Sequence, residues 1–242
     1  MSSPASEGAA PAVIVPRCFA AFPEVTAGFG TRAFSDTAPR VLILKQIHSS
    51  IVHTVTHDTL LDYVESQKLL AGDAWVTQET GITLGIRTAD CAPLLFYDPV
   101  HRVIAAAHAG WRGLVGGIIE TTLSTMARAY GSCAADVRVA IGPAICQACF
   151  EIGPEVAAVF RAKLGEQAPL RPGTGDRRHL DLAAACGQVL TRAGVPATQI
   201  DALILCTACR TDWFYSYRKE GPKTGRLVAF IGVGARVEGE GC

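Results

Sequence analysis

The stretch that decides the fold is VIAAAHAGWRG, residues 103–113. Its first five residues are apolar and predict a buried strand. That run ends in His108, and the turn that follows is flanked by Gly110 and Gly113. Strand ends are rigid, and the N-terminus of a following helix offers free N–H groups and a partial positive charge. The stretch therefore predicts that His108 lies in a functional site at the edge of a sheet.

Short apolar and β-branched runs occur along most of the chain, and each predicts a strand. Most neighbouring runs are too close for a helix to cross between them, which favours mixed or antiparallel sheets. We therefore predict an α+β fold in which helices pack outside mixed sheets. The two runs on either side of His48 are expected to form a hairpin. The predicted strands are residues 13–15, 25–31, 41–46, 51–56, 74–77, 82–87, 93–97, 102–107, 137–141, 200–206 and 227–233.

Three longer segments have the apolar spacing of helices, with Gly131 ending the first and Asp181 capping the third. Residues 58–70 fit a loop or a short helix. Because no repeat or low-complexity linker is present, residues 13–242 are expected to form a single domain, with residues 1–12 as a disordered tail. The predicted helices are residues 114–130, 154–164 and 182–193.

Composition argues against several classes of protein. The chain has 22 basic and 22 acidic residues, which gives no electrostatic footprint for a nucleic acid or an anionic membrane. No apolar run of about 18 residues is present to span a membrane, and residues 1–11 do not resemble a signal peptide. The nine cysteines are an odd number, which favours reduced thiols. We therefore expect a cytoplasmic protein with neither nucleic-acid nor membrane partners.

Three residues that can bind a metal lie in similar contexts. His48 ends one apolar run, Cys91 lies between two predicted strands, and His108 ends a third run. Two imidazoles and a thiolate could hold one zinc ion and leave a fourth position open, as catalytic zinc sites do. Two alternatives stay open: each histidine could be a satisfied core residue, and Cys91 could be a nucleophile paired with His108.

Motifs argue against two metalloenzyme classes. A multicopper oxidase needs many histidine ligands, including His–x–His pairs, but the chain has six histidines and no such pair. The zinc nucleoside deaminases require His–x–Glu, which is also absent. Separately, Cys146/Cys149 and Cys206/Cys209 form two Cys–x–x–Cys pairs that could make a four-thiolate zinc site.

Seven motifs, taken in order along the chain, resemble one family. It is the purine nucleoside phosphorylase family once labelled multicopper polyphenol oxidase or laccase-domain proteins, and it includes proteins called peptidoglycan editing factor. The resemblance covers roughly residues 26–233. The motifs are Gln46–His48, Gly72–Thr77, Thr88–Leu95, His108–Gly113, Ile141–Ile145, Cys149–Gly153, and Phe214–Gly221 with Gly225–Arg226.

The resemblance implies a single α-β-β-α layered sandwich domain. It implies phosphorolysis of adenosine, inosine and methylthioadenosine together with deamination of adenosine, so that a purine nucleoside and phosphate are the partners. Zinc is the implied cofactor, with His48, Cys91 and His108 as its ligands and the last two as catalytic residues. The candidate substrate-binding residues are Arg32, Gln46, Arg112 and Arg218. No oligomeric state is predicted.

Several roles have a structural alternative. Arg112 could bind an anion or pair with a local carboxylate, and Arg218 could contact substrate or lie on a strand face. Asp90 could orient a histidine ligand or cap a turn. The chain departs from the family pattern in its short segment 33–44 and at Ser49, where the family has glycine.

Two other functions fit the same residues. The first is a hydrolase that edits nucleotide-linked muramic acid precursors of peptidoglycan, using the zinc or the Cys91–His108 pair. The second is a metal-stabilised binding partner without activity. The resemblance implies no second metal at the Cys–x–x–Cys pairs.

Overall fold

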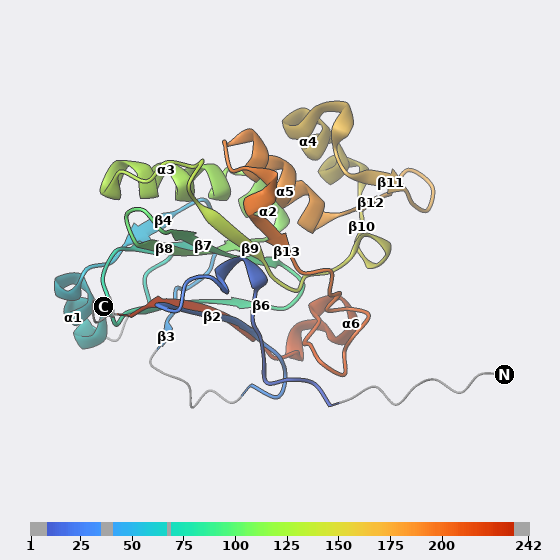
Figure 1. Cartoon of the computed structure of the whole chain (residues 1–242). Helices are drawn as coiled ribbons and strands as arrows, with labels where there is room; N and C mark the ends of the chain where they lie inside the picture. The colour runs from blue at the N-terminus through green and yellow to red at the C-terminus, as the bar shows by residue number, and fades with distance from the viewer. Residues whose placement is uncertain (1–8, 35–40, 67–68, 235–242) are drawn as a thin grey trace.

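Two β-sheets packed face to face form the centre of the molecule in the computed structural model, which describes residues 9–34, 41–66 and 69–234 (Figure 1). Both sheets mix parallel and antiparallel pairs. In spatial order, the five-stranded sheet consists of β1 (Val13–Ile14), β2 (Val25–Gly30), β14 (Leu227–Val233), β6 (Thr83–Thr88) and β3 (Val41–Leu42). The six-stranded sheet consists of β13 (Ile200–Ala202), β9 (Arg138–Ile141), β7 (Ala92–Asp98), β8 (Val103–Ala109), β5 (Ala74–Thr77) and β4 (Val52–Thr54).

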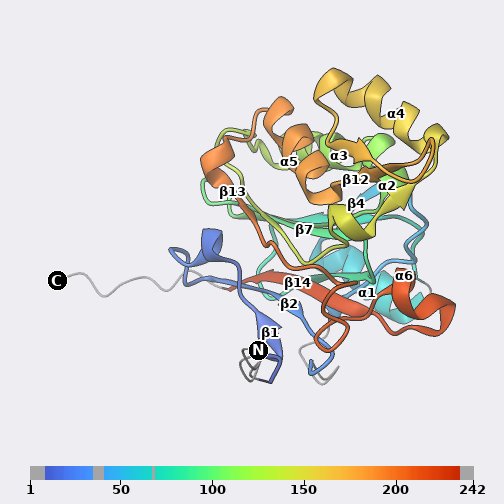
Figure 2. The same cartoon turned by 90° about the vertical axis from the view of Figure 1, so that its right-hand side faces the viewer.

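Helices cover the outer face of the six-stranded sheet, whereas α1 and α6 lie toward the other sheet (Figure 1). Both views show α3, α4 and α5 on one side of the sheets, with β2 and β14 on the far side (Figures 1 and 2). No helix in the described part of the chain is long and apolar enough to cross a membrane. The helices are α1 (His57–Ser66), α2 (Trp111–Val115), α3 (Ile118–Tyr130), α4 (Pro154–Leu164), α5 (Leu182–Arg192) and α6 (Tyr217–Glu220).

The central strands β7 and β8 are buried on both faces, which explains their near-continuous apolar sequence. Side chains alternate between two cores because successive residues of a strand point to opposite faces. Leu94 and Phe96 contact the helices, whereas Leu95 and Tyr97 lie in the core between the sheets. This alternation fixes the register, since a slip of one residue would exchange the two cores.

The predicted α+β fold with mixed sheets and outer helices is confirmed, but the predicted hairpin around His48 is wrong. Strand β3 pairs with β6 in the five-stranded sheet, and β4 pairs with β5 in the six-stranded sheet. The chain between them therefore crosses from one sheet to the other. Two adjacent apolar runs look alike whether they pair with each other or with strands elsewhere, so the sequence could not separate these cases.

Other predicted elements also have different bounds. The helix expected over 114–130 is interrupted at Gly116 and Gly117, where Gly117 has a left-handed φ of 94°. The strand expected over 200–206 ends at Ala202. A small three-stranded sheet was not predicted, because its strands have two or three residues each and carry no periodicity: β10 (Glu151–Ile152), β12 (Arg178–Leu180) and β11 (Leu170–Pro172). Of the predicted N-terminal tail, residues 1–8 lie outside the described residues, and residues 9–12 form no helix or strand.

Candidate active site

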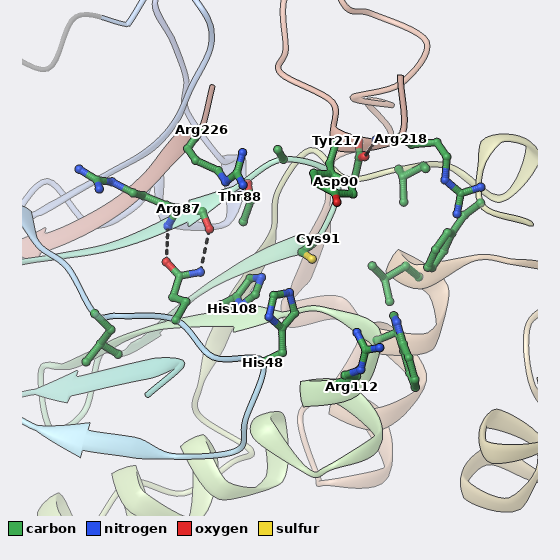
Figure 3. A pocket seen from close by; sticks show the side chains of 17 residues that line it. His48, Arg87, Thr88, Asp90, Cys91, His108, Arg112, Tyr217, Arg218 and Arg226 are labelled. Carbon is green, nitrogen blue, oxygen red and sulfur yellow. Dashed lines mark hydrogen bonds between the residues drawn. The ribbon is translucent and has the colours of Figure 1, made fainter. Parts of the chain in front are cut away.

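The three predicted metal-binding residues converge at one edge of the space between the sheets. His48 lies on the crossing from β3 to β4, and Cys91 lies on the crossing from β6 to β7. His108 is the penultimate residue of β8, on the face that Ile104 and Ala106 also present to the core between the sheets. The three side chains point toward one another in Figure 3, and their potential ligand atoms all lie within 4.8 Å of one another.

A fully buried carboxylate, Asp73, braces two of these residues. Its oxygens accept hydrogen bonds from the backbone N–H of His48 (3.0 Å) and Ser49 (2.7 Å), and from the Ser49 hydroxyl (2.7 Å). The same group lies 2.8 Å from Nδ1 of His108. Because Nδ1 is engaged by Asp73, Nε2 is the atom that His108 presents to Cys91 and His48.

This assignment corrects one interpretation of Asp90. The residue does not orient a histidine: its carboxylate accepts hydrogen bonds from the Thr207 hydroxyl (2.6 Å) and the Arg218 backbone N–H (2.7 Å). Its carboxylate therefore holds the start of α6 through contacts distant in the sequence, rather than capping a local turn. The sequence analysis did not assign this role to Asp73, although the Gly72–Thr77 motif contains it. The reason is that Asp73 and His108 lie far apart in the sequence, so no local pattern indicates that they form a hydrogen bond.

Electrostatics favour a charged pair at the centre of the site. Burial raises the pKa of the Cys91 thiol, but hydrogen bonds and charge from His108 and His48 outweigh it and hold that pKa at about 6. Burial lowers the pKa of His108, but bonds to Asp73 and Cys91 raise it to about 9. Burial would raise the pKa of Asp73, yet bonds from His108 and Ser49 keep it at about 2. Without a metal the pair is thus a thiolate beside an imidazolium.

The backbone around the site is constrained. His48 has a φ of 60° and Asp90 a φ of 95°, in the left-handed region that costs a non-glycine residue energy. Gly110 leaves no room for a side chain, since a Cβ there would lie 2.9 Å from Cδ2 of His48 and 3.0 Å from Sγ of Cys91. Tertiary contacts therefore hold the three residues in place.

The donor set fits a transition metal such as zinc. Two imidazoles and a thiolate with a lowered pKa are ligands that zinc prefers, and a bound metal requires them deprotonated. His108 is buried, Cys91 is half-buried and His48 is exposed, so one side of the trio faces solvent. Three protein ligands with an open side match a catalytic site better than a closed structural one.

The open side leads into a cavity of about 660 Å³, a volume typical of small-molecule sites. Its lining combines aromatic rings, which can stack on a planar ligand, with positive charge, which suits an anion. The aromatic lining residues are Trp111, Phe150 and Tyr217. The arginines, which Figure 3 labels, are Arg87, Arg112, Arg218 and Arg226.

Three of the four predicted substrate-binding residues line the cavity, and the fourth does not. Arg112 lines the cavity and stacks over Trp111 at 4.4 Å. Gln46 also lines it, but its amide donates to the Arg87 carbonyl (2.7 Å) and accepts from the Arg87 N–H (2.8 Å). Arg218 also lines the cavity, and it donates to the backbone carbonyls of Cys149 and Glu151, on either side of Phe150.

Arg32 is not among the residues that line this cavity. Its guanidinium bonds to Glu220 and to the Phe214 carbonyl, and it stacks on Tyr215 at 4.3 Å. The structure therefore brings Gln46, Arg112 and Arg218 to the site and places Arg32 behind the α6 segment. Arg87 and Arg226 line the cavity although they were not predicted as binding residues; Arg226 did belong to a quoted motif.

Comparisons with known proteins agree with this architecture. A family model described as multi-copper polyphenol oxidoreductase laccase matches residues 30–234. The chain is 39% identical over 194 residues to adenosine deaminase RL5 from an unknown prokaryotic organism, covering 78% of this chain and 72% of that protein. It is 42% identical over 182 residues to a purine nucleoside phosphorylase of Deinococcus radiodurans, and the match covers 74% of this chain and 68% of that protein.

Solved structures show the same fold. Hypothetical protein YfiH of Bacillus licheniformis has a TM-score of 0.83 and 28% identity, covering 93% of this chain and 97% of that one. YlmD of Geobacillus stearothermophilus has a TM-score of 0.81 and 27% identity, and the match covers 88% of this chain and 93% of that one. The names of the relatives support the prediction that the chain is an enzyme of the purine nucleoside phosphorylase or adenosine deaminase type.

Proposed function

Because the chain belongs to the family described as multi-copper polyphenol oxidoreductase laccase, we propose that it is a zinc-dependent purine nucleoside phosphorylase that also deaminates adenosine. The observation that carries the proposal is the placement of His48, Cys91 and His108 at the edge of a cavity lined by arginines and aromatic rings. Adenosine, inosine and methylthioadenosine are the proposed nucleosides, and the cytoplasm is the proposed location.

The arginines supply the phosphate half of the site. Among the described residues, no hydrogen bond or ion pair engages the guanidinium group of Arg87 or of Arg112. The Arg112 guanidinium stacks on the Trp111 ring, which leaves its N–H groups free. Both are therefore available to a phosphate, which guanidinium groups bind in a bidentate manner. In phosphorolysis a phosphate oxygen bonds to C1′ of the ribose while the bond from C1′ to the purine nitrogen breaks, giving ribose 1-phosphate and the free base.

The aromatic residues supply the purine half. Trp111, the first residue of α2, and Phe150, which directly precedes β10, line the cavity, and Tyr217 is 53% exposed at its rim. Stacking holds the base while the arginines hold the phosphate, so that both reactants are placed together before reaction. This positioning accounts for a large share of the rate enhancement in a two-substrate reaction.

His48, Cys91 and His108 would hold the zinc, which supplies Lewis acidity and lowers the pKa of water for deamination. Asp73 keeps His108 in one tautomer and one ring orientation, so its Nε2 stays directed at the site. Deamination replaces the 6-amino group of adenosine with an oxygen from water, and releases inosine and ammonia.

The proposal is tested by incubating purified protein with adenosine, with and without phosphate. We expect adenine and ribose 1-phosphate only when phosphate is present, and deamination in both cases, seen as inosine without phosphate and as inosine together with hypoxanthine with it. His108→Ala should abolish both reactions because it removes a ligand. His57→Ala, which changes an exposed histidine on α1, should leave both unchanged. Phosphate-dependent release of adenine at the normal rate by His108→Ala would refute the assignment.

A second variant separates the two reactions. Arg112→Ala should raise the KM for phosphate about tenfold, which corresponds to about 1.4 kcal/mol. Deamination without phosphate should stay within about twofold of the original rate, because Arg112 has no part in activating water. Equal loss of both reactions would contradict the role given to this arginine.

One observation favours a second candidate function. The thiolate–imidazolium pair of Cys91 and His108 is the form in which cysteine acts as a nucleophile. It supports the hydrolase of nucleotide-linked muramic acid precursors. Turnover of such a precursor that persists after zinc is chelated, with no turnover of adenosine, would favour this function over the phosphorylase.

A further inference from the structure

We propose that Cys146, Cys149, Cys206 and Cys209 hold a second zinc ion, in a closed structural site separate from the His48–Cys91–His108 trio. The four thiols come from two loops that follow β9 and β13. These two strands are parallel neighbours, so their C-terminal ends meet at the same edge of the six-stranded sheet. The proposal does not depend on the proposed activity.

Backbone hydrogen bonds hold the two loops together independently of any metal ion. Ala144 and Cys206 form an isolated parallel bridge. The Ala144 N–H donates to the Leu205 carbonyl, and the Thr207 N–H donates to the Ala144 carbonyl, each at 3.2 Å. Each Cys–x–x–Cys pair is therefore fixed relative to the other, as a preformed site requires.

The sulfur geometry matches one tetrahedral ion. Sγ of Cys209 lies 3.5 Å from Sγ of Cys149 and 3.9 Å from Sγ of Cys146, and all four sulfurs lie within 4.8 Å of one another. Zinc–sulfur bonds of about 2.3 Å in a tetrahedron place the sulfurs about 3.8 Å apart. All four cysteines are free thiols. An iron–sulfur cluster contains several metal atoms and spreads its cysteines further, so a single ion fits better.

Backbone N–H groups point at one sulfur. Those of Cys146 and Cys209 lie 3.2 Å and 3.4 Å from Sγ of Cys206, with geometry suited to donation. Donation of this kind stabilises a thiolate, the form that binds metal. With four protein sulfurs no position is left for water or substrate, so the site is of the structural type.

The location gives this ion a role in shaping the cavity. Ile145 and Phe150, beside the first cysteine pair, line the cavity. Arg218, which follows the second pair, donates to the carbonyls of Cys149 (3.3 Å) and Glu151 (3.1 Å). An ion joining the two loops would fix the wall that carries Phe150 and Arg218.

The test counts metal ions in protein purified under reducing conditions without chelators. We expect about two zinc ions per chain in the original protein and about one in the double variant Cys149→Ser/Cys209→Ser. The matched control Cys133→Ser removes an exposed thiol outside the cluster and should not change the count. His108→Ala should lose the other zinc and keep the four-thiolate one, so failure of either site is seen separately.

A second measurement covers the case in which the double variant does not fold. His108→Ala loaded with Co²⁺ should show the intense thiolate-to-metal absorption of a tetrahedral four-sulfur site, and Cys133→Ser in the same background should show the same spectrum. Bound cobalt without this absorption would overturn the proposal. So would an unchanged zinc count in the double variant, iron at these cysteines, or a Cys149–Cys209 disulfide in the freshly purified protein.

Discussion

The His48–Cys91–His108 trio and the four-cysteine cluster are both groups of potential metal ligands, yet the fold braces them in different ways. His48 and Cys91 lie where the chain crosses between the two sheets and His108 lies near the end of β8, and a buried carboxylate braces the two histidines. The cluster lies on loops, where N–H groups point at one of its sulfurs and Cys209 is exposed. The trio has three ligands and lines the cavity of about 660 Å³; the cluster has four, of which Cys146 and Cys206 line a second, smaller pocket.

This difference shows why similar residue types serve different purposes. A reactive site needs an open position and side chains held rigidly by their surroundings. A structural site needs only a complete set of ligands, because the ion itself supplies the rigidity. Removing the metal or the bracing side chains of one region should therefore change activity and stability differently from the same change in the other region.

Removal of metal should have the largest effect. We expect a mild chelator to take zinc first from the three-ligand trio, because its open position admits the chelator. Activity should then be almost completely lost while the unfolding temperature changes little. A stronger chelator should next remove the four-thiolate zinc and lower the unfolding temperature. Parallel assays of activity, bound zinc and thermal unfolding check this order, and loss of both ions in one step would contradict it.

Asp73→Asn should have the next largest effect. The amide cannot stabilise His108 as the carboxylate does, so we expect activity and zinc affinity at the trio to fall about 10- to 100-fold. The zinc held by the four cysteines should stay bound. Asp176→Asn, at an exposed carboxylate, is the matched control. Steady-state kinetics with metal analysis test this, and activity within about twofold of the original would show that Asp73 is no brace.

Glu220→Gln should have the smallest effect, and it probes the α6 wall of the cavity next to the cysteine loops. Hydrogen bonds from Arg32, the Ser216 N–H and Thr224 lower the pKa of Glu220 to about 2. A carboxyl with a lowered folded-state pKa stabilises the fold above its unfolded pKa of about 4.3, and this contribution is lost as pH falls toward about 2.

The variant should therefore unfold at a lower urea concentration than the original protein near neutral pH. The difference should narrow as the pH falls below about 4.3. Activity at neutral pH should change little, since Glu220 does not line the cavity. A difference in urea midpoint that stays constant across this pH range would contradict the assignment.

Much of the fold could be predicted from local patterns. The strands at 74–77 and 227–233 and the helix at 154–164 have the predicted bounds, because apolar periodicity and terminal proline or glycine are local signals. The error at His48 concerns which strands pair with each other. The runs around His48 were predicted to pair with each other, but pairing depends on strands elsewhere in the chain.

For the candidate site, too, local features could be predicted from the sequence and long-range contacts could not. His48, Cys91 and His108 were identified because their residue types and motifs are visible in one dimension, and the structure brings them within 4.8 Å. The sequence did not show that Asp73 holds His108, or that Arg32 lies behind α6, away from the cavity lining. Hydrogen bonds between residues distant in the chain leave no periodic signal.

The sequence by itself therefore determined the element types, the α+β class and the residues capable of chemistry, since these depend on side-chain identity and short-range spacing. Only the tertiary structure decided which strands share a sheet, which carboxylate braces His108, and which arginines reach the cavity. It also placed two separate Cys–x–x–Cys pairs against each other, because the ends of parallel strands meet at one edge whatever their distance along the chain.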